Sequence, residues 1–428
     1  MSTVVDVNVQ KPASPLRVRN FRLLWIGEAI SLLGDQFYMI ALPWLVLQLT
    51  GSALALGTVM ALAGIPRAVF VLVGGAFVDR FSPRSVMIAS NFARLVLVVL
   101  LSALVLTNTI RIEMLYVFAL AFGLADSFYF PGQSAIVPRL LAEDQLQAGN
   151  TYVQGTAQLS LFLGPVLAGA LVALLGQVAT GASNTEGIGI AFGIDALSFV
   201  ASLLCLNLMD TPNVPKQVGE QQNVFESIKA GFAYLWSQTI LRVFFLLMIA
   251  INFLVLGPVF VGIPVLAATR LAEGAVAFGI VMSAFGGGAL LGIILSNVLP
   301  PLKPKHFGTM LLLITSCLGI GIALMPLFSS TAVVSVIMLL MGVTNGYVNI
   351  NFFTWLQKRI PQELMGRVMS LLFFSSIGLA PVSNALAGAI LQINLNILFV
   401  GGGVLMAALS LAAILLPAVR QMGLDTAQ

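Results

Sequence analysis

Residues 85–107 read SVMIASNFARLVLVVLLSALVLT, an apolar run that carries one charged side chain, Arg94. A helix needs about 20 mostly apolar residues to cross roughly 30 Å of hydrocarbon, so this run is long enough to span a membrane. Similar runs recur along the chain and predict twelve spans, near residues 21–49, 54–78, 85–107, 113–136, 147–175, 188–208, 240–268, 275–299, 307–328, 332–356, 366–391 and 395–417. The sequence therefore predicts an all-α integral membrane protein with twelve transmembrane helices.

The composition excludes a water-soluble fold and several classes of function. Of the 428 residues, 59% are apolar and 8% are charged, whereas soluble domains draw about a quarter of their residues from charged types. The net charge of +4 does not indicate nucleic-acid binding, because no basic run exceeds two residues and no aromatic-interleaved basic patch is present. Two cysteines within apolar runs and one histidine leave no disulfide scaffold and no His/Cys metal cluster. We therefore expect no metal and no cofactor.

One gap between the predicted spans is longer than the others and divides them into six and six. It covers residues 209–239 and begins with the breaker-rich stretch DTPNVP at 210–215. Apolar residues from Phe225 to Trp236 recur at helical spacing, which predicts an amphipathic helix near 224–236 on the cytoplasmic membrane surface, as a docking linker or a regulatory element. The expected segments are a cytoplasmic N-terminal tail at 1–20, a six-helix bundle at 21–208, this cytoplasmic linker at 209–239, a second six-helix bundle at 240–417 and a cytoplasmic C-terminal tail at 418–428.

The distribution of Lys and Arg predicts which ends of the spans face the cytoplasm. Short cytoplasmic loops retain these residues, and sixteen of the twenty fall in cytoplasmic segments if the N-terminus is inside. Arg111 and Arg270 fall on the other side, and Arg67 and Arg94 lie within spans. The first 20 residues are polar and contain two prolines, so they do not have the pattern of a cleavable signal peptide. We expect a multi-pass protein of the cell inner (plasma) membrane with both termini in the cytoplasm.

The stretch GAFVDRFSPR at 75–84 lies at the predicted cytoplasmic end of the second span. Its Gly75, Asp79, Arg80 and Arg84 resemble the signature loop of the major facilitator superfamily, with Ser and Pro where Gly and a basic residue are usual. A Gly permits close helix contact, whereas Asp and Arg suit the positive and negative ends of neighbouring helices. The resemblance implies the major facilitator fold of two pseudo-symmetric six-helix halves, with these residues and Arg367 as a conformational-switch motif. The corresponding stretch of the second half, at 292–305, is degenerate.

A narrower resemblance is to the drug–proton antiporter group that contains the macrolide efflux proteins. WIGEAIS at 25–31 followed by LGD at 33–35 is similar to the first helix of that group, and GRV at 366–368 to the start of its eleventh. LGPVLAG at 163–169 resembles the antiporter motif of the fifth helix, with Gly164, Pro165 and Gly169 as members, and we expect Gly164 and Pro165 to break that helix. The resemblance implies a secondary transporter that works as a monomer and exports amphipathic small molecules or drugs in exchange for protons. A lysophospholipid or lipid flippase and a siderophore exporter share much of the pattern and remain alternatives.

Charged residues deep within the predicted spans, away from their ends, are the strongest candidates for function. They are Glu28, Asp35, Arg67, Arg94, Asp126 and Asp195. Each costs roughly 2.5 to 3.5 kcal/mol at the centre of a membrane helix, so each needs a partner, water or a function. Glu28 and Asp35 are seven residues apart and share one helix face, where a carboxyl group removed from water could exchange a proton near neutral pH. We predict Asp35 as the first proton-coupling site and Glu28 as the second, or as the origin of a preference for cationic substrates. The alternative is that both form ion pairs with the two arginines.

The other four charges have both structural and functional interpretations. Asp126 could line a substrate cavity or join a hydrogen-bond network with nearby polar residues of the fourth span. Asp195 begins a polar stripe on the sixth span, which favours a packing contact. Arg67 follows a proline and could hold freed carbonyl groups or a carboxylate, whereas Arg94 is expected to pair or to extend toward the cytoplasm. We therefore treat Arg67, Arg94 and Asp195 as intramembrane charge partners.

Uncharged polar residues within the spans complete the predicted substrate-binding site. With Glu28 and Asp126, the candidates are Gln154, Gln158, Asn252, Asn345, Asn349 and Ser376. Some of these are expected to form only helix–helix hydrogen bonds. No Gly-rich loop ends in Gly-Lys-Ser/Thr, so ATP is not expected to drive transport directly. A membrane enzyme or receptor is the remaining class, but no convergent Ser/His/Asp, paired-His or Cys/His set supports an enzyme. The expected partners are a small-molecule substrate, protons and membrane lipid, with no nucleic acid.

Overall fold

A computed structural model of the chain describes residues 14–80, 82–176, 185–210, 224–299, 306–417 and 419. The side chains of residues 71–80, 176, 224–228 and several positions between 362 and 377 lie outside this description. The tails predicted at 1–20 and 418–428 and the linker predicted at 209–239 therefore fall partly outside the described residues.

Every regular element in the described part of the chain is helical. The first half comprises the 3-10 turn η1 (Pro15–Arg17), α1 (Arg19–Thr50), α2 (Ala53–Arg80), α3 (Pro83–Leu106), α4 (Ile112–Asp126), α5 (Tyr129–Leu140), α6 (Glu143–Gly176) and α7 (Glu186–Asn207). The rest comprises α8 (Val224–Ser237), α9 (Thr239–Gly257), the π-helical turn η2 (Pro258–Gly262), α10 (Ile263–Arg270), α11 (Ala275–Val298), α12 (Phe307–Leu324), η4 (Met325–Leu327), α13 (Thr331–Arg359), α14 (Gln362–Ile377), α15 (Ala380–Ile393), η5 (Ile397–Gly401) and α16 (Gly402–Ile414). Among the described residues, eleven helical segments are long and apolar enough to cross a membrane, and α15 is a shorter apolar helix. The all-helical membrane fold is therefore confirmed, whereas the count of twelve spans stays a prediction.

Three of the predicted spans are interrupted. The span at 113–136 is divided into α4 and α5, the span at 240–268 contains η2 between α9 and α10, and the span at 366–391 is divided into α14 and α15. A proline lies at or close to each interruption, namely Pro131, Pro258 and Pro381. Proline lacks a backbone N–H and its ring crowds the preceding turn, so the helical hydrogen-bond ladder cannot continue unchanged.

In contrast, α6 is continuous through Pro165, so the helix does not end at Gly164 and Pro165, and a bend there stays a prediction. Pro165 cannot donate to the carbonyl of Leu161, and that carbonyl packs directly against Gly286 of α11. The next amide, of Val166, donates to the Ser283 hydroxyl of α11 at 2.9 Å. The neighbouring helix thus supplies packing and a hydrogen bond where the ladder of α6 is weakened, and the helix has no need to end.

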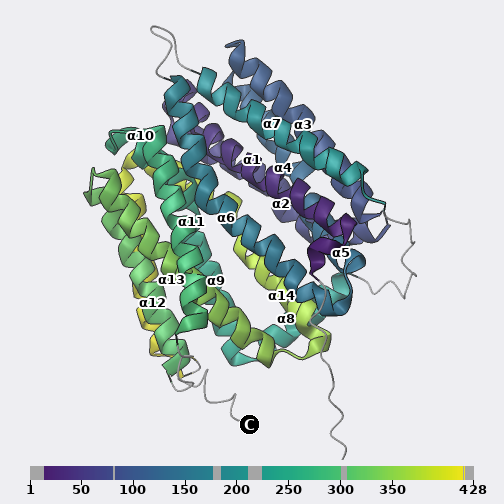
Figure 1. The fold of residues 1–428 in the computed structure, drawn as a ribbon. Helices are drawn as coiled ribbons and strands as arrows, with labels where there is room; N and C mark the ends of the chain where they lie inside the picture. The colour runs from purple at the N-terminus through teal and green to yellow at the C-terminus, as the bar shows by residue number, and fades with distance from the viewer. Residues whose placement is uncertain are drawn as a thin grey trace, which may run out of the picture.

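The helices form two halves that lie side by side (Figure 1). In the first half, α1 and α3 pack against α7; in the second, α11 packs against α13 and α12 against α16. Between the halves, α2 contacts α15 and α6 contacts α11. Below, the linker side is the end of the bundle that contains Arg19 and Asn207, and the far side is the end that contains Thr50 and Gly274.

The hydrophobic core shows on which side the halves meet. One cluster on the far side contains residues of both halves, including Ile40, Leu45, Leu266 and Phe278. Toward the linker side, the first half has its own cluster around Phe21 and Met87. The second half has another, around Phe244 and Trp355. The halves therefore share one core on the far side and keep separate cores on the linker side.

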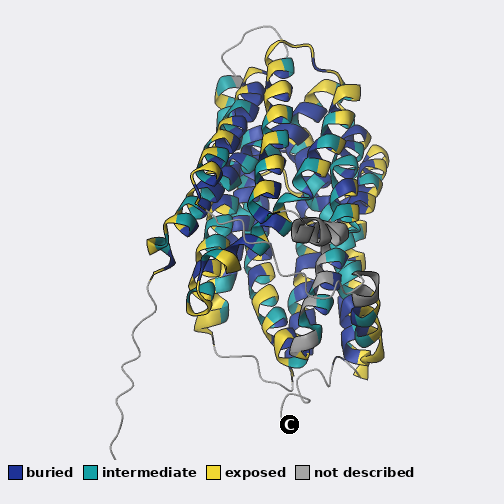
Figure 2. Ribbon diagram, turned by 90° about the vertical axis from the view of Figure 1, so that its right-hand side faces the viewer, coloured by how far each residue is buried: buried dark blue, intermediate teal, exposed yellow. Residues whose placement is uncertain are grey.

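Large apolar side chains cover much of the outside of the bundle. Exposed residues follow the outer faces of the helices in Figure 2, and Val117 and Leu197 are 67% and 68% exposed. Water would disfavour so much exposed apolar surface, but lipid tails do not. The outer surface is thus the one expected of helices that satisfy their backbone hydrogen bonds internally within a bilayer.

Candidate functional site

A buried arginine of α3 is the centre of a cluster of charged side chains in the first half. Arg94 is 2% exposed; its Nη1 donates to Asp126 Oδ1 at 2.8 Å and its Nη2 to Asn91 Oδ1 at 2.7 Å. The guanidinium carbon lies 4.6 Å from the ring centroid of Tyr129 and 4.4 Å from that of Phe199. These contacts offset the removal of the cation from water, so Arg94 pairs within the bundle.

Asp126, the last residue of α4, joins two arginines from different helices. Its Oδ2 accepts a hydrogen bond from Arg67 Nη2 of α2 at 2.5 Å, and its Oδ1 accepts from Arg94. Charge-assisted hydrogen bonds of this kind are roughly twice as strong as neutral ones. Asp126 is thus part of a hydrogen-bond network, but with arginines of α2 and α3 instead of the predicted polar residues of its own span, and its part in a substrate cavity stays a prediction.

Asp35 of α1 belongs to the same cluster but is held less tightly. Its Oδ1 lies 3.9 Å from Arg94 Nη1, and its side chain is 30% exposed. The Arg67 side chain is 43% exposed. Because α1 and α2 each contact helices of the second half, we infer that both side chains border the space between the halves. Coulomb attraction weakens with distance and with solvent, so Asp35 is the carboxylate whose charge can change with the least disturbance to the pairing.

Glu28 lies two turns before Asp35 on α1 and is 3% exposed. Its Oε1 accepts a hydrogen bond from the side-chain amide of Gln133 on α5. Its Oε2 and the hydroxyl of Ser31 have no hydrogen-bond partner among the described residues. A buried polar atom without a partner costs free energy. These two oxygens on α1 are therefore available to bind a proton, a water or a polar group of a ligand.

Asp195 of α7 is fully buried against α1. The Ser198 hydroxyl donates to the Asp195 carbonyl at 2.7 Å, and Asp195 Oδ2 has no partner within the part of the chain that the structure describes. An added Cβ at Gly34 would overlap Ser198 and lie 2.9 Å from Asp195 Oδ1. Asp195 thus makes the close helix contact expected from the sequence, and its carboxyl group lies beside the residue that precedes Asp35.

This close contact gives a prediction about stability. Gly34→Val should lower the free energy of unfolding by about 1–3 kcal/mol, because the added atoms force α1 away from α7. Gly155 of α6 is the matched control, since an added Cβ there meets no atom within 4 Å. Gly155→Ala should raise the stability by about 0.5–1 kcal/mol, as expected for Gly to Ala in a helix. Thermal unfolding of both variants in the same detergent measures the difference, and equal shifts would contradict the packing.

Two members of the cluster were not predicted from the sequence, namely Asn91 and Phe199. Asn91 precedes Arg94 by three residues, which places both on one helix face. That spacing was a signal that could have identified it. Phe199 is one of 28 phenylalanines, so composition offered no way to select it.

The hydrogen bonds that the structure describes for the uncharged candidates lead away from the cluster. Gln158 Nε2 donates to the Gly286 carbonyl at 3.3 Å across the contact between α6 and α11, and Asn252 donates to the Met248 carbonyl within α9. Gln154, Asn345 and Asn349 are exposed, and the side chain of Ser376 lies outside the description. Their part in substrate binding therefore stays a prediction.

Comparison with known proteins identifies the family. The profile of the family described as Major Facilitator Superfamily matches residues 24–383. The chain belongs to the major facilitator superfamily. It is 24% identical over 411 residues to the multidrug efflux pump Tap of Mycobacterium tuberculosis, with 94% of each chain covered. It is 25% identical to macrolide efflux protein A of Streptococcus pyogenes, over 94% of this chain and 97% of that protein.

Two further comparisons extend this result. The enterobactin exporter EntS of Shigella flexneri is 24% identical over 86% of this chain and 84% of its own length. The crystal structure of the nucleoside transporter NupG superimposes with a TM-score of 0.69 over 92% of this chain and 98% of that one, at 14% identity, which shows the fold alone. This member of the major facilitator superfamily is thus a multi-pass transport protein of a cell membrane and not an enzyme.

The signature loop of this superfamily member is described only in part. The side chains of Gly75, Asp79 and Arg80 lie outside the described residues. The Arg84 guanidinium donates to the carbonyls of Leu206 and Asn207, at 2.7 and 2.9 Å. These carbonyls are at the C-terminal end of α7, where the helix dipole favours a cation. In the second half, Arg367 of α14 packs against Gly231 of α8.

The stretch that resembles the antiporter motif lies where the halves meet. An added Cβ at Gly169 would lie 2.6 Å from the Ala275 carbonyl and 3.1 Å from Gly279 Cα of α11. Gly164 makes room instead for Gln36 of α1. Backbones can approach this closely only where side chains are absent, so the motif lets α6 contact both α11 and α1.

Proposed function

We propose that this transporter exports amphipathic small molecules, among them cationic compounds, in exchange for protons. The observation that carries the proposal is the charge cluster of Asp35, Arg67, Arg94 and Asp126. The six charged residues deep within the predicted spans all lie in the first half. The similarity to Tap and to macrolide efflux protein A supports export of drug-like molecules.

Counting charges shows how the cluster can exchange a proton for a cation. Two arginines face two carboxylates, so the four groups are neutral when Asp35 is ionised. When Asp35 binds a proton, the four groups carry a net charge of +1, which repels a cationic substrate. Loss of that proton removes the repulsion, and the nearby Glu28 adds a negative group. Proton and cation binding therefore oppose each other, as exchange requires.

The contacts between the halves support alternating access. The shared core on the far side and the separate cores on the linker side correspond to a state that is open toward the linker side. With both termini in the cytoplasm, as the distribution of Lys and Arg indicates, this is the inward-open state. The motif of Gly164, Pro165 and Gly169 then belongs to the contact that must open for release. One chain contains all these parts, in agreement with a functional monomer.

The proposal predicts the effect of Asp35→Asn. Purified protein in liposomes should move a fluorescent amphipathic cation, such as ethidium, only while a proton gradient is present. Asp35→Asn should reduce gradient-driven movement to background, because the side chain can no longer bind and release a proton. Glu28→Gln should lower transport of the cation more than that of a neutral amphipathic compound. Dye fluorescence in proteoliposomes and drug susceptibility of cells that express each variant are the measurements.

The control is Glu113→Gln, which removes an exposed acid at the far-side start of α4. This variant should transport like the wild type. The proposal fails if dissipating the proton gradient leaves export unchanged and Asp35→Asn transports normally.

Siderophore export is the second candidate function, supported by the similarity to EntS. A lipid or lysophospholipid flippase of the same fold is the third. The same liposomes distinguish them, because a fluorescent lysophospholipid would change leaflet only under the flippase hypothesis. Uptake of an iron-free siderophore in place of the cation would support the second candidate.

A further inference from the structure

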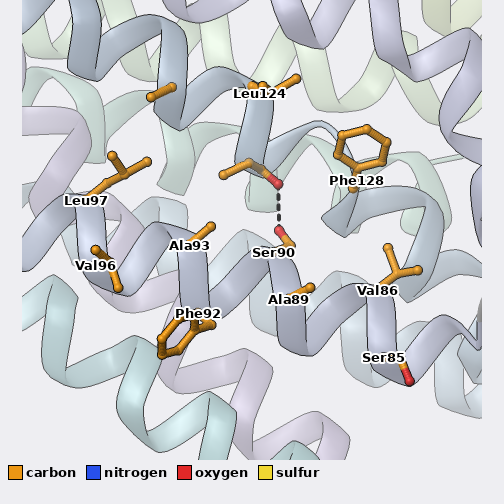
Figure 3. A pocket seen from close by; sticks show the side chains of 12 residues that line it. Ser85, Val86, Ala89, Ser90, Phe92, Ala93, Val96, Leu97, Leu124 and Phe128 are labelled. Atoms are coloured by element: carbon orange, nitrogen blue, oxygen red, sulfur yellow. Dashed lines mark hydrogen bonds between the residues drawn. The ribbon is translucent and has the colours of Figure 1, made fainter.

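A groove on the outside of the first half is separate from the charge cluster. It lies between α3 and α4, is closed at one end by Phe128, and has a volume of about 860 Å³ (Figure 3). Ten of the twelve residues that line it are apolar. Volumes of this size are typical of sites for small molecules, so the groove is large enough to hold a ligand.

Small residues create the groove. Ala89 and Ala93 of α3 and Ala121 and Ala125 of α4 leave space between the two helices. Larger side chains stand along it, and Phe92 is 60% exposed. Two serines line the groove. The Ser90 hydroxyl donates to the Ala125 carbonyl at 2.7 Å, as the dashed line in Figure 3 shows, and the Ser85 hydroxyl lies 2.7 Å from that of Ser82, within hydrogen-bonding distance. With both hydroxyls already engaged in hydrogen bonds, the groove favours a hydrocarbon.

The position and length of the groove indicate which kind of hydrocarbon it would bind. In Figure 1, α3 lies at the outer edge of the first half, away from the second half. The groove therefore opens toward the bilayer. From Ser85 to Leu97, α3 rises about 18 Å at roughly 1.5 Å per residue, close to the roughly 15 Å of one leaflet of the hydrocarbon core. Ser85 lies in the first turn of α3, at the linker-side surface.

We propose that this groove binds one acyl chain of a phospholipid from the linker-side leaflet. The chain would lie directly behind the charge cluster. Asn91 and Arg94 are buried on the inner side of α3, opposite the groove, and Ala125 of the groove precedes Asp126. A bound acyl chain would thus brace the two helix segments that position Arg94 and Asp126, and would link the state of the bilayer to the cluster.

Native mass spectrometry of the full chain, released from nanodiscs of phosphatidylethanolamine and phosphatidylglycerol, tests the proposal. The wild type should keep one phospholipid under activation that removes the others. Ala93→Trp, which fills the groove, should lose it. Ala103→Trp is the matched control, because Ala103 is exposed on α3 but lies outside the groove, and it should keep the lipid.

A second measurement distinguishes loss of lipid binding from a folding defect of the variant. Adding phospholipid to delipidated protein should raise the melting temperature of the wild type and of Ala103→Trp, but not of Ala93→Trp or the milder Ala89→Leu. The proposal is overturned if the wild type keeps no phospholipid, or if Ala93→Trp keeps as many as the control. Displacement of the lipid by excess ethidium from wild-type protein would also overturn it, because the groove would then be a substrate site.

Discussion

Arg94→Met is expected to lower the free energy of unfolding by about 3 kcal/mol, the lower end of the cost of removing one partner from a buried ion pair. Met fills a similar volume but leaves the carboxylate of Asp35 without its nearest cation and Asn91 Oδ1 without its donor. The effect is at the lower end because Asp126 keeps its bond to Arg67. Transport should fall to background, because the cluster would no longer have a cation between Asp35 and Asp126.

Two controls separate charge from geometry in this experiment. Arg111→Met removes an exposed arginine on the far side. It should leave both the free energy of unfolding and the transport rate unchanged. Arg94→Lys keeps the charge but cannot bond Asn91 and Asp126 together while stacking between two rings. Arg94→Lys should have a higher melting temperature than Arg94→Met, but its transport rate should still be far below that of the wild type. Equal melting temperatures for Arg94→Met and Arg111→Met would show that the cluster contributes nothing to stability.

The second large effect is expected for Gly279→Val of α11. Gly279 lies against the Pro165 carbonyl and the Cα of Gly169, across the contact between the halves. A valine side chain would overlap this backbone and prevent the far side from closing. Under the alternating access proposed above, the halves can still rest in the other state, so transport should be lost while the protein remains folded.

Gly342→Val of α13 is the matched control. Gly342 packs against the Phe285 carbonyl and the Cα of Gly288, within the second half, where the contact is needed in every state. This variant should lower the melting temperature more than Gly279→Val, as overpacking of a permanent contact does.

The state of the far side can be followed through Ser283. This residue is 6% exposed and accepts the Val166 amide across the same contact. In a protein with Cys205→Ser and Cys317→Ser, the thiol of Ser283→Cys should react slowly with a water-soluble thiol reagent. Gly279→Val should increase that rate. An unchanged rate together with normal transport would mean that the α6–α11 contact does not control access.

The membrane fold could be predicted from the sequence with few exceptions. In lipid, every backbone polar group must be paired within its own segment, so an apolar run of sufficient length has little choice but to form a helix. The exceptions are at prolines. Pro165 lies in a continuous helix and Pro381 follows an interruption, although both lack the same N–H. The difference at Pro165 is that Ser283 and Gly286 of another helix compensate, and no local pattern in the sequence shows this.

The charged residues of the candidate site could be predicted from the sequence, but which carboxylate pairs with which arginine could not. The cost of a charge in a membrane marked Asp35, Arg67, Arg94 and Asp126 in advance. In the structure, Asp126 pairs with both arginines, whereas Asp35 Oδ1 lies 3.9 Å from Arg94 Nη1. This difference depends on how α1, α2, α3 and α4 are rotated against one another. Those rotations follow from close contacts such as that of Gly34 with Ser198, which involve residues far apart in the chain.

The sequence by itself thus determined that this protein is a helical membrane protein whose deep intramembrane charges lie in the first half, because hydropathy and charge act within each segment. Its resemblance to the major facilitator superfamily implied transport. The tertiary structure decided which carboxylate forms short ion pairs and which lies farther from its arginine, because packing between segments sets those distances. For the same reason, it decided on which side the halves meet.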